Sequence, residues 1–261
     1  MYPILGAYGP FFLYSYTVVM GVGILAGLGL TARQWRNTPD SNWIDGILIG
    51  LLLGLPGGRV GFVVANALYF AERPVEIWPV WLGGLSYHGA LLTGLLGWWG
   101  WCRWRKRPFS HDANRAAPGL ALAHTFGWLA CWLEGSAYGL PTFLGFWAAD
   151  LPDTYGVFAV RYQTQLAGMV AGLLILGLAI WIRQKRPFFP IFWLTLGLLN
   201  TTHAVISLYR GDSMPKLGDW RVDTLFGLLF ALLSAILLYF QAKRIASIKK
   251  TPATQLNHRE R

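Results

Sequence analysis

The sequence predicts an all-α polytopic membrane protein with seven transmembrane helices, its N-terminus outside the cytoplasm and its C-terminus inside. Three observations support this fold class. Hydrophobic residues make up 54% of the 261-residue chain and charged residues only 13%, a balance that suits lipid better than water as the solvent. Fourteen Trp and thirty-one Gly are typical of closely packed helices with aromatic rings at the lipid headgroups. The third observation is the uneven distribution of Lys and Arg between alternate loops.

Seven apolar stretches are long enough to cross a bilayer core, which requires roughly 20 residues per helix. No soluble domain fits between them, so we expect residues 1–242 to form one transmembrane domain. The polar stretch 243–261 is expected to be a disordered, basic cytoplasmic tail. The first stretch is interpreted as a retained span, because the first basic residue, Arg33, follows it. The seven stretches lie near residues 11–32, 46–70, 84–102, 117–138, 164–183, 188–209 and 222–242.

The basic residues between the spans determine the predicted orientation. Sixteen Lys and Arg fall in the loops and tail on one side, and five fall on the other side. The positive-inside rule makes the side with sixteen cytoplasmic, and seven spans then place the N-terminus outside. The formal net charge of +10 is therefore mostly a matter of topology, and no nucleic-acid partner is expected.

Polar side chains inside the predicted spans gather on shared helix faces. Each costs on the order of 2.5–3.5 kcal/mol at mid-bilayer on insertion scales, so each needs a partner or a use. Arg59 and Asn66 in the second span are seven residues apart, which is close to two helical turns. His124, Cys131 and Glu134 share one side of the fourth span at about 100° per residue.

The third and sixth spans add further candidates. Asn200, His203 and Ser207 are spaced three and four residues apart and share one side of the sixth span. His88 enters the third span through a glycine-rich turn, residues 83–89. We therefore expect an active or binding cavity that faces the outer leaflet. Four of the polar residues lie in the outward half of their spans in the predicted orientation: His88, Asn66, Glu134 and His203.

The second span also carries Pro56-Gly57-Gly58-Arg59 in its middle. Proline removes a backbone donor, and two glycines loosen the helix, so a break is expected here. Free amides beside a guanidinium would suit a phosphate. The alternative is a packing kink, with Arg59 paired to Glu134 or to backbone carbonyls. For His124, a hydrogen-bonded interior histidine is the favoured interpretation.

Neither cysteine indicates a disulfide or a metal site. Cys102 and Cys131 lie in or beside apolar spans without ligand spacing. Each is interpreted as a small buried side chain.

Two segments resemble the bacterial prolipoprotein diacylglyceryl transferase family. Residues 57–63 read GGRVGFV and are similar to the family's GGRIGYV, and residues 81–89 read WLGGLSYHG and are similar to W-x-GG-M-S-F/Y-H-G-G. The resemblance extends from Gly9 to about Leu225. Weaker pieces are Gly9-Pro10 followed by Tyr16, the segment 131–139 with Glu134 and Gly139, and the segment 161–166, which begins with Arg161.

The chain departs from the family pattern at three places. Trp128 stands where the family's fourth span has an arginine, and Trp cannot hold a phosphate as Arg does. His203 aligns with a sixth-span arginine and Ser207 with a nearby glutamate. Ala167-Gly168 replaces the family's Tyr-Glu. Either other residues substitute, or the chain has left the family's reaction.

The resemblance implies transfer of the diacylglyceryl group of phosphatidylglycerol to the lipobox cysteine of a prolipoprotein, which forms a thioether. An imidazole, with an unperturbed pKa of about 6.5, is matched to deprotonating a thiol of pKa about 8.5. His88 is the expected base, and the other expected catalytic residues are His203 and Tyr16. The expected substrate-binding residues are Arg59, Glu134, Asn66, Gly139 and Arg161.

The same resemblance implies a monomer in the bacterial inner membrane, with no metal or organic cofactor. Its partners would be phosphatidylglycerol and the signal-peptide lipobox. Two alternatives stay open. One is a catalytically altered member that binds anionic phospholipid without transfer, and the other is a small-anion transporter that uses Arg59 and the histidines along a pore.

Overall fold

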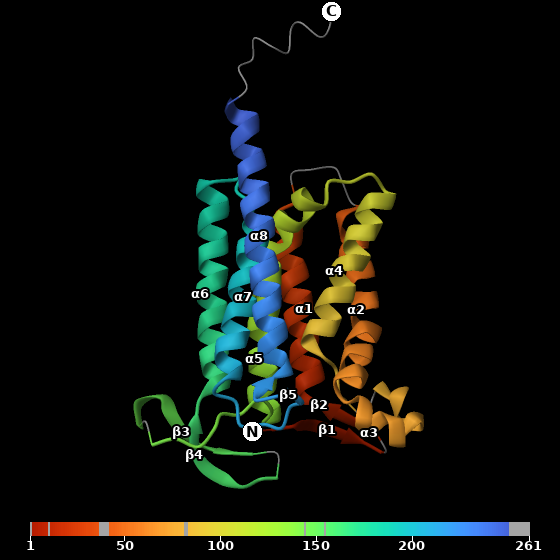
Figure 1. Ribbon diagram of the computed structural model, residues 1–261, viewed down its shortest axis with the longest axis vertical. Coiled ribbons are helices and arrows are strands. Elements are labelled where there is room, and N and C mark those ends of the chain that lie inside the picture. Colours follow the sequence, from red (N-terminus) through yellow and green to blue (C-terminus); the bar gives the residue numbers. More distant parts are fainter. Residues whose placement is uncertain are drawn as a thin grey trace, which may run out of the picture.

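The computed structural model describes residues 2–9, 11–36, 42–80, 83–143, 145–153 and 155–250. In this part of the chain, seven helices of 17 residues or more run along one bundle axis (Figure 1). The chain is therefore mainly helical, as the sequence predicts. The long helices are α1 (Ser15–Arg33), α2 (Trp43–Ala65), α4 (Tyr87–Trp104), α5 (Phe109–Glu134), α6 (Thr164–Lys185), α7 (Ile191–Ser207) and α8 (Val222–Lys250).

Four of the described helices are long and apolar enough to cross a membrane: α1, α2, α6 and the Val222–Ser247 part of α8. Helix α7 is apolar but shorter. Helix α4 is rich in Trp and Gly, and α5 begins with a polar turn. Both are therefore less hydrophobic by composition, although each coincides with one predicted stretch.

The connections divide between the two ends of the bundle (Figure 1). The last residues of α1, α4, α6 and α8 lie at one end, and we call this the loop end. The strands and a short helix lie at the other end, which we call the hairpin end. The strands, which the all-α prediction missed, pair as three small antiparallel sheets in the described residues. The hairpin end holds β1 (Ile4–Tyr8), β2 (Phe11–Tyr14), α3 (Ala67–Glu72), the 3-10 turn η1 (Pro74–Ile77), η3 (Gly145–Trp147), β3 (Ala148–Pro152), β4 (Phe158–Tyr162), β5 (Lys216–Leu217) and β6 (Trp220–Arg221).

The predicted break at Pro56 is wrong, because α2 runs through it as one helix. The glycines there serve close packing on α4. A Cβ added to Gly89 of α4 would lie 2.6 Å from the carbonyl oxygen of Gly57. The hydroxyl of Thr93 donates to the carbonyl oxygen of Leu53 at 3.0 Å, which satisfies a carbonyl in the turn that the proline disturbs.

Several predicted boundaries shift, and the fourth span shifts at both ends, because α5 runs from Phe109 to Glu134 instead of over 117–138. The first span begins at Ser15, because residues 11–14 form β2. The second span ends at Ala65, where Asn66 separates α2 from α3. Helix α8 continues to Lys250, so residues 243–250, expected to be disordered, are helical. Residues 251–261 of the expected tail lie outside the described residues.

Candidate active site

Aromatic and imidazole rings from four helices meet near the hairpin end of the bundle. The rings of His88 and His203 are 5.1 Å apart and almost perpendicular. Tyr87 stacks on His203 with ring centroids 5.0 Å apart. We call the group the histidine cluster, and its members are Tyr87, His88, His124, Trp128, His203, Phe226 and Phe230.

The glycine-rich turn before α4 places His88 in the cluster. Gly83 and Gly84 have φ of +86° and +80°, a backbone region that glycine adopts without steric cost. Ser86 caps α4 by accepting a hydrogen bond from the Gly89 amide at 3.2 Å. His88 therefore lies in the first turn of α4, with 5% of its surface exposed. Trp81 and Leu82 of the same motif lie outside the described residues.

The histidines of the cluster differ in their hydrogen bonding. The Nε2 atom of His88 is buried and has no hydrogen-bond partner among the described residues. The Nε2 atom of His124 accepts a hydrogen bond from Nε1 of Trp128 at 3.0 Å. The interpretation of His124 as a hydrogen-bonded interior histidine is therefore confirmed. His88 is left with a ring nitrogen that can accept a proton.

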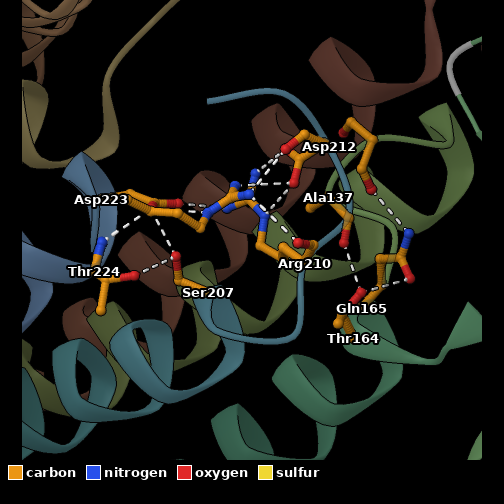
Figure 2. Close-up of polar contacts among 10 residues, drawn as sticks. Ala137, Thr164, Gln165, Ser207, Arg210, Asp212, Asp223 and Thr224 are labelled. Atoms are coloured by element: carbon orange, nitrogen blue, oxygen red, sulfur yellow. Dashed lines mark hydrogen bonds and ion pairs between the residues drawn. The ribbon is translucent and has the colours of Figure 1, made fainter. Parts of the chain in front are cut away.

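Two arginines and two aspartates interlock between the end of α7 and the start of α8 (Figure 2). Arg210 bonds both carboxylate oxygens of Asp212 and lies 3.3 Å from Asp223. Arg221 donates to Asp212 at 3.1 Å and to Asp223 at 3.4 Å. The hydroxyl of Ser207 donates to Asp223 at 2.6 Å. All four charged side chains are 15% exposed or less, so the network is rigidly held.

This network lies next to the histidine cluster. Arg210 and Arg221 are both close enough to His203 to act on it electrostatically. Backbone hydrogen bonds from Leu140 to Tyr209 and from Gly211 to Tyr138, each 2.8 Å, fold Arg210 back over the end of α5. Burial opposes the charge of Arg210, but its hydrogen bond to Asp212 and the two carboxylates outweigh this, so its pKa is raised.

The start of α6 holds the turn that follows α5 (Figure 2). Nε2 of Gln165 donates to the Ser136 carbonyl at 2.9 Å, and the Thr164 hydroxyl donates to the Ala137 carbonyl at 2.6 Å. Gln165 is fully buried. The segment 161–166, singled out from the sequence, therefore fixes the chain just after Glu134.

Arg59 bonds backbone carbonyls in the turn before α4. Its guanidinium donates to the backbone carbonyls of Glu76 (2.5 Å), Ile77 (2.8 Å) and Gly83 (2.6 Å). A fourth bond reaches Gly84 at 3.1 Å. The alternative interpretation, pairing with carbonyls, is therefore correct, although the partner is not Glu134. Arg59 holds the turn that leads into His88.

Three other predicted substrate-binding residues also make structural contacts. Asn66 caps α2 by donating to the Phe62 carbonyl at 2.9 Å. Arg161 pairs with Asp153 at 3.2 Å within the β3–β4 hairpin. A Cβ on Gly139 would lie 2.7 Å from Cβ of Tyr162, so Gly139 permits a close backbone approach. Their described contacts place none of them at the histidine cluster.

Tyr16 and Glu134 do lie near each other, although they come from different helices. Tyr16, on α1, is within electrostatic range of both Cys131 and Glu134 on α5. Cys131 is in turn within range of Arg210. Tyr16 lies in the first turn of α1 and Glu134 ends α5, so both lie at the hairpin end.

A sequence model described as prolipoprotein diacylglyceryl transferase matches residues 3–240. The chain belongs to the prolipoprotein diacylglyceryl transferase family. Curated relatives are named phosphatidylglycerol–prolipoprotein diacylglyceryl transferase. The protein of Thermus thermophilus is 29% identical over 92% of this chain and 98% of its own length. The protein of Corynebacterium efficiens is 28% identical over 97% of this chain and 85% of its own length. The protein of Nitratidesulfovibrio vulgaris is 31% identical over 83% of this chain and 83% of its own length.

The predicted family is therefore confirmed, but sequence reasoning missed part of this transferase's candidate site. Asp212, Arg221 and Asp223 were not among the candidates, and the sequence left open only whether Arg161 or Arg210 folds back over the cavity in place of a missing family arginine. The segment 210–223 nevertheless reads Arg-x-Asp twice, at 210–212 and 221–223. Alternating opposite charges in a loop between two apolar stretches could have indicated an ion-pair network. Tyr87, which stacks on His203, carried no such signal.

Proposed function

We propose that this chain transfers the diacylglyceryl group of phosphatidylglycerol to the lipobox cysteine of a prolipoprotein, and that the reaction occurs at the histidine cluster. The observation that carries the proposal is His88, whose buried Nε2 has no hydrogen-bond partner in the described part of the chain. Membership of the family and the names of the relatives support the reaction class.

The reaction needs a base, a cationic group that stabilises the leaving phosphate, and an apolar path for the lipid. The cysteine sulfur forms a bond to the terminal glycerol carbon of the diacylglyceryl group, and the bond from that carbon to the phosphate oxygen breaks. Glycerol phosphate leaves with the electron pair. The thiol proton passes to the base, for which an imidazole is well suited near neutral pH.

His88 takes the role of base, and the imidazole nitrogens of His203, whose ring lies 5.1 Å from that of His88, serve as hydrogen-bonding groups for the substrate beside it. The rings of Phe226 and Phe230 flank His88 at 6.0 and 5.7 Å and keep water from its free nitrogen. Arg210 neutralises the developing charge on the leaving phosphate, since it is cationic and acts on His203 across a short distance. It thereby replaces Arg59 in the role expected from the sequence.

Tyr16 and Glu134 orient the headgroup from the other side of the end of α5. The proximity of this pair to Cys131, which Arg210 also reaches, supports the assignment. Arg59, Asn66, Gly139 and Arg161 act as positioning residues, because their described contacts hold turns and hairpins.

Lipid reaches the cluster between α4 and α8. Phe226 is 44% exposed on α8, whereas His88 behind it is 5% exposed, so this ring separates His88 from the lipid side. Movement of Phe226 would open a lateral path for acyl chains, which need an apolar route.

The proposed topology has seven spans in the inner membrane, with the hairpin end outside, the loop end in the cytoplasm, and the chain acting as a monomer. The sixteen basic residues on the cytoplasmic side support it. A thiol reagent that cannot cross membranes should label Val157→Cys in intact cells and Lys243→Cys only after permeabilisation. The reverse pattern would invert the topology.

The test of the reaction is a lipidation assay with purified protein, phosphatidylglycerol and a lipobox peptide. We expect a thioether-linked product, and His88→Gln should lower kcat/KM by about 100-fold or more, the range of general-base catalysis. The matched control is His111→Gln, which replaces a half-exposed histidine at the loop end. This variant should change kcat/KM by less than about twofold. Full activity in His88→Gln would exclude His88 as the base.

A second candidate function is binding of anionic phospholipid without transfer. Trp128 and His203, which replace family arginines, favour it. In that case the native protein would retain phosphatidylglycerol through purification yet give no product in the assay.

A further inference from the structure

Among the described residues, two arginines without a carboxylate partner lie at the loop end of the bundle, the end opposite the histidine cluster. The carboxylate of Asp112 forms an ion pair with Arg107, whose Nε lies 2.9 Å from Oδ2. The guanidinium of Arg115 lies 4.1 Å from the ring centroid of Trp35, and its Nη1 is buried without a hydrogen-bond partner among the described residues. Its charge is thus not neutralised by any described carboxylate contact.

Arg183 is the second such group, at the end of α6. Its Nε donates to Oε1 of Gln34 at 2.8 Å, and its Nη1 donates to the carbonyl oxygen of Asn114 at 3.1 Å. Both acceptors are neutral, so they fix the guanidinium in place without compensating its charge. Arg115 is close enough to repel it. An anion placed here would relieve this repulsion.

A cavity of about 300 Å³ lies against Arg183. Gln34, Arg183 and Gln184 supply polar groups to its wall, and Ile180 and Pro187 supply apolar ones. Arg183 lies two residues before the end of α6, and this helix is one of those apolar enough to span a membrane. The cavity is therefore expected at headgroup depth, where basic side chains meet anionic lipids.

We propose that this cavity binds the phosphate group of an anionic phospholipid from the leaflet at the loop end, as a site separate from the one for the lipid substrate. The Nη2 group of Arg183, whose Nε and Nη1 are already anchored, donates to the phosphate. The amides of Gln34 and Gln184 can add donors, and Ile180 contacts the start of an acyl chain. The mixed polar and apolar wall favours a lipid over free phosphate.

The test measures binding of phosphatidic acid to the purified full chain in phosphatidylcholine nanodiscs, by native mass spectrometry and thermal shift. Phosphatidic acid carries the phosphate but has no glycerol headgroup to release, so turnover does not enter the measurement. Arg183→Gln should weaken binding about tenfold, the value of one charge-assisted hydrogen bond. Lys185→Gln removes the same charge two residues away, outside the cavity wall, and should change the affinity by less than about twofold.

A second variant keeps the proposal testable if Arg183→Gln folds poorly. Ile180→Trp fills the cavity while leaving Arg183 intact, and it should reduce lipid binding as strongly. Equal losses in Arg183→Gln and Lys185→Gln, or unchanged binding in Ile180→Trp, would overturn the site. If millimolar inorganic phosphate raised the unfolding temperature as much as phosphatidic acid does, the assignment of the site to a lipid would be overturned. His88→Gln should bind phosphatidic acid like the native protein, so this proposal and the transfer reaction fail independently.

Discussion

The guanidinium of Arg59 on α2 donates a hydrogen bond to the carbonyl oxygen of Gly83 at 2.6 Å. This bond joins the middle of the glycine-rich helix to the turn that starts α4. It connects the two segments with the strongest family resemblance to each other. A residue that looks like a ligand-binding arginine in the sequence therefore acts as a clamp on the turn before His88.

Replacing Arg59 should affect folding more than lipid affinity. Arg59→Gln leaves buried carbonyls without their donor, and we expect a loss of about 3 kcal/mol in unfolding free energy. Arg59→Lys, which keeps the charge but has fewer donors, should lose about half of that. Unfolding in detergent and phosphatidylglycerol affinity should be measured together. Native stability with weakened lipid binding would instead show that Arg59 contacts the headgroup.

His203 should matter for the reaction through its imidazole, beyond its ring shape. His203→Phe preserves a ring against Tyr87 but removes both nitrogens, and we expect kcat/KM to fall by about tenfold or more with little change in stability. His124→Phe, the matched control, breaks the hydrogen bond from Trp128 and should cost about 1 kcal/mol of stability with a smaller effect on rate. Native kcat/KM in His203→Phe would contradict the proposed role.

Phe226 should control lipid access to His88. Phe226→Ala removes the ring on the lipid side of His88, so we expect KM for phosphatidylglycerol to change by about threefold or more, since burial of a large apolar group contributes up to a few kcal/mol. Leu229→Ala, on the same helix and similarly exposed at 45%, is the control. If both variants have the same KM as the native protein, the proposal that lipid enters between α4 and α8 is wrong.

The Arg210–Asp212 pair should behave as a coupled unit. A double-mutant cycle with Arg210→Gln and Asp212→Asn should give a coupling energy of about 1–3 kcal/mol, because breaking a buried pair leaves a lone charge. The raised pKa of Arg210 means that its contribution is fully present at neutral pH and is lost only when the pH rises past the usual pKa of arginine. An additive cycle would show that the two side chains act independently.

Gly139 should be intolerant of even a small side chain. In Gly139→Ala, the new Cβ would meet Cβ of Tyr162 at 2.7 Å, and we expect a loss of about 1–3 kcal/mol from overpacking. Gly177→Ala is the control, because nothing lies within 4 Å of its Cβ position, and it should be neutral or slightly stabilising. The comparison requires only thermal unfolding. A stable Gly139→Ala protein would show that the 138–141 segment can move.

Helix positions were predictable from the sequence, whereas the partners of the polar side chains were not. Each of the seven apolar stretches overlaps one long helix, because helical periodicity and hydropathy are local properties, although only four of the described helices are long and apolar enough to cross a membrane. The positions of His88 and His203 within their predicted spans indicated that they lie in the same half of the bundle, and the structure brings their rings together. Spacing cannot show what a side chain meets across the bundle. Arg59 bonds residues up to 25 positions away, and Arg210 depends on how a loop folds back over α5.

The three hairpins were missed for a related reason. Their strands are only two to five residues long, too short for an alternating pattern to stand out beside apolar spans. Tight turns stabilise them instead, as where Asp153 accepts hydrogen bonds from the amides of Tyr155 and Val157. Such turns need the whole loop to be placed before they can be recognised.

The length of α8 has a practical consequence for experiments on living cells. Its 29 residues span about 43 Å at 1.5 Å per residue, whereas the hydrocarbon core is about 30 Å thick. The final turns carry the exposed Lys243 and Arg244. They project as a continuous helix past the rest of the bundle (Figure 1). A fluorescent reporter fused directly after residue 250 would be held at a fixed height beyond the loop end of the bundle, which makes this position suitable for measuring distances from that end.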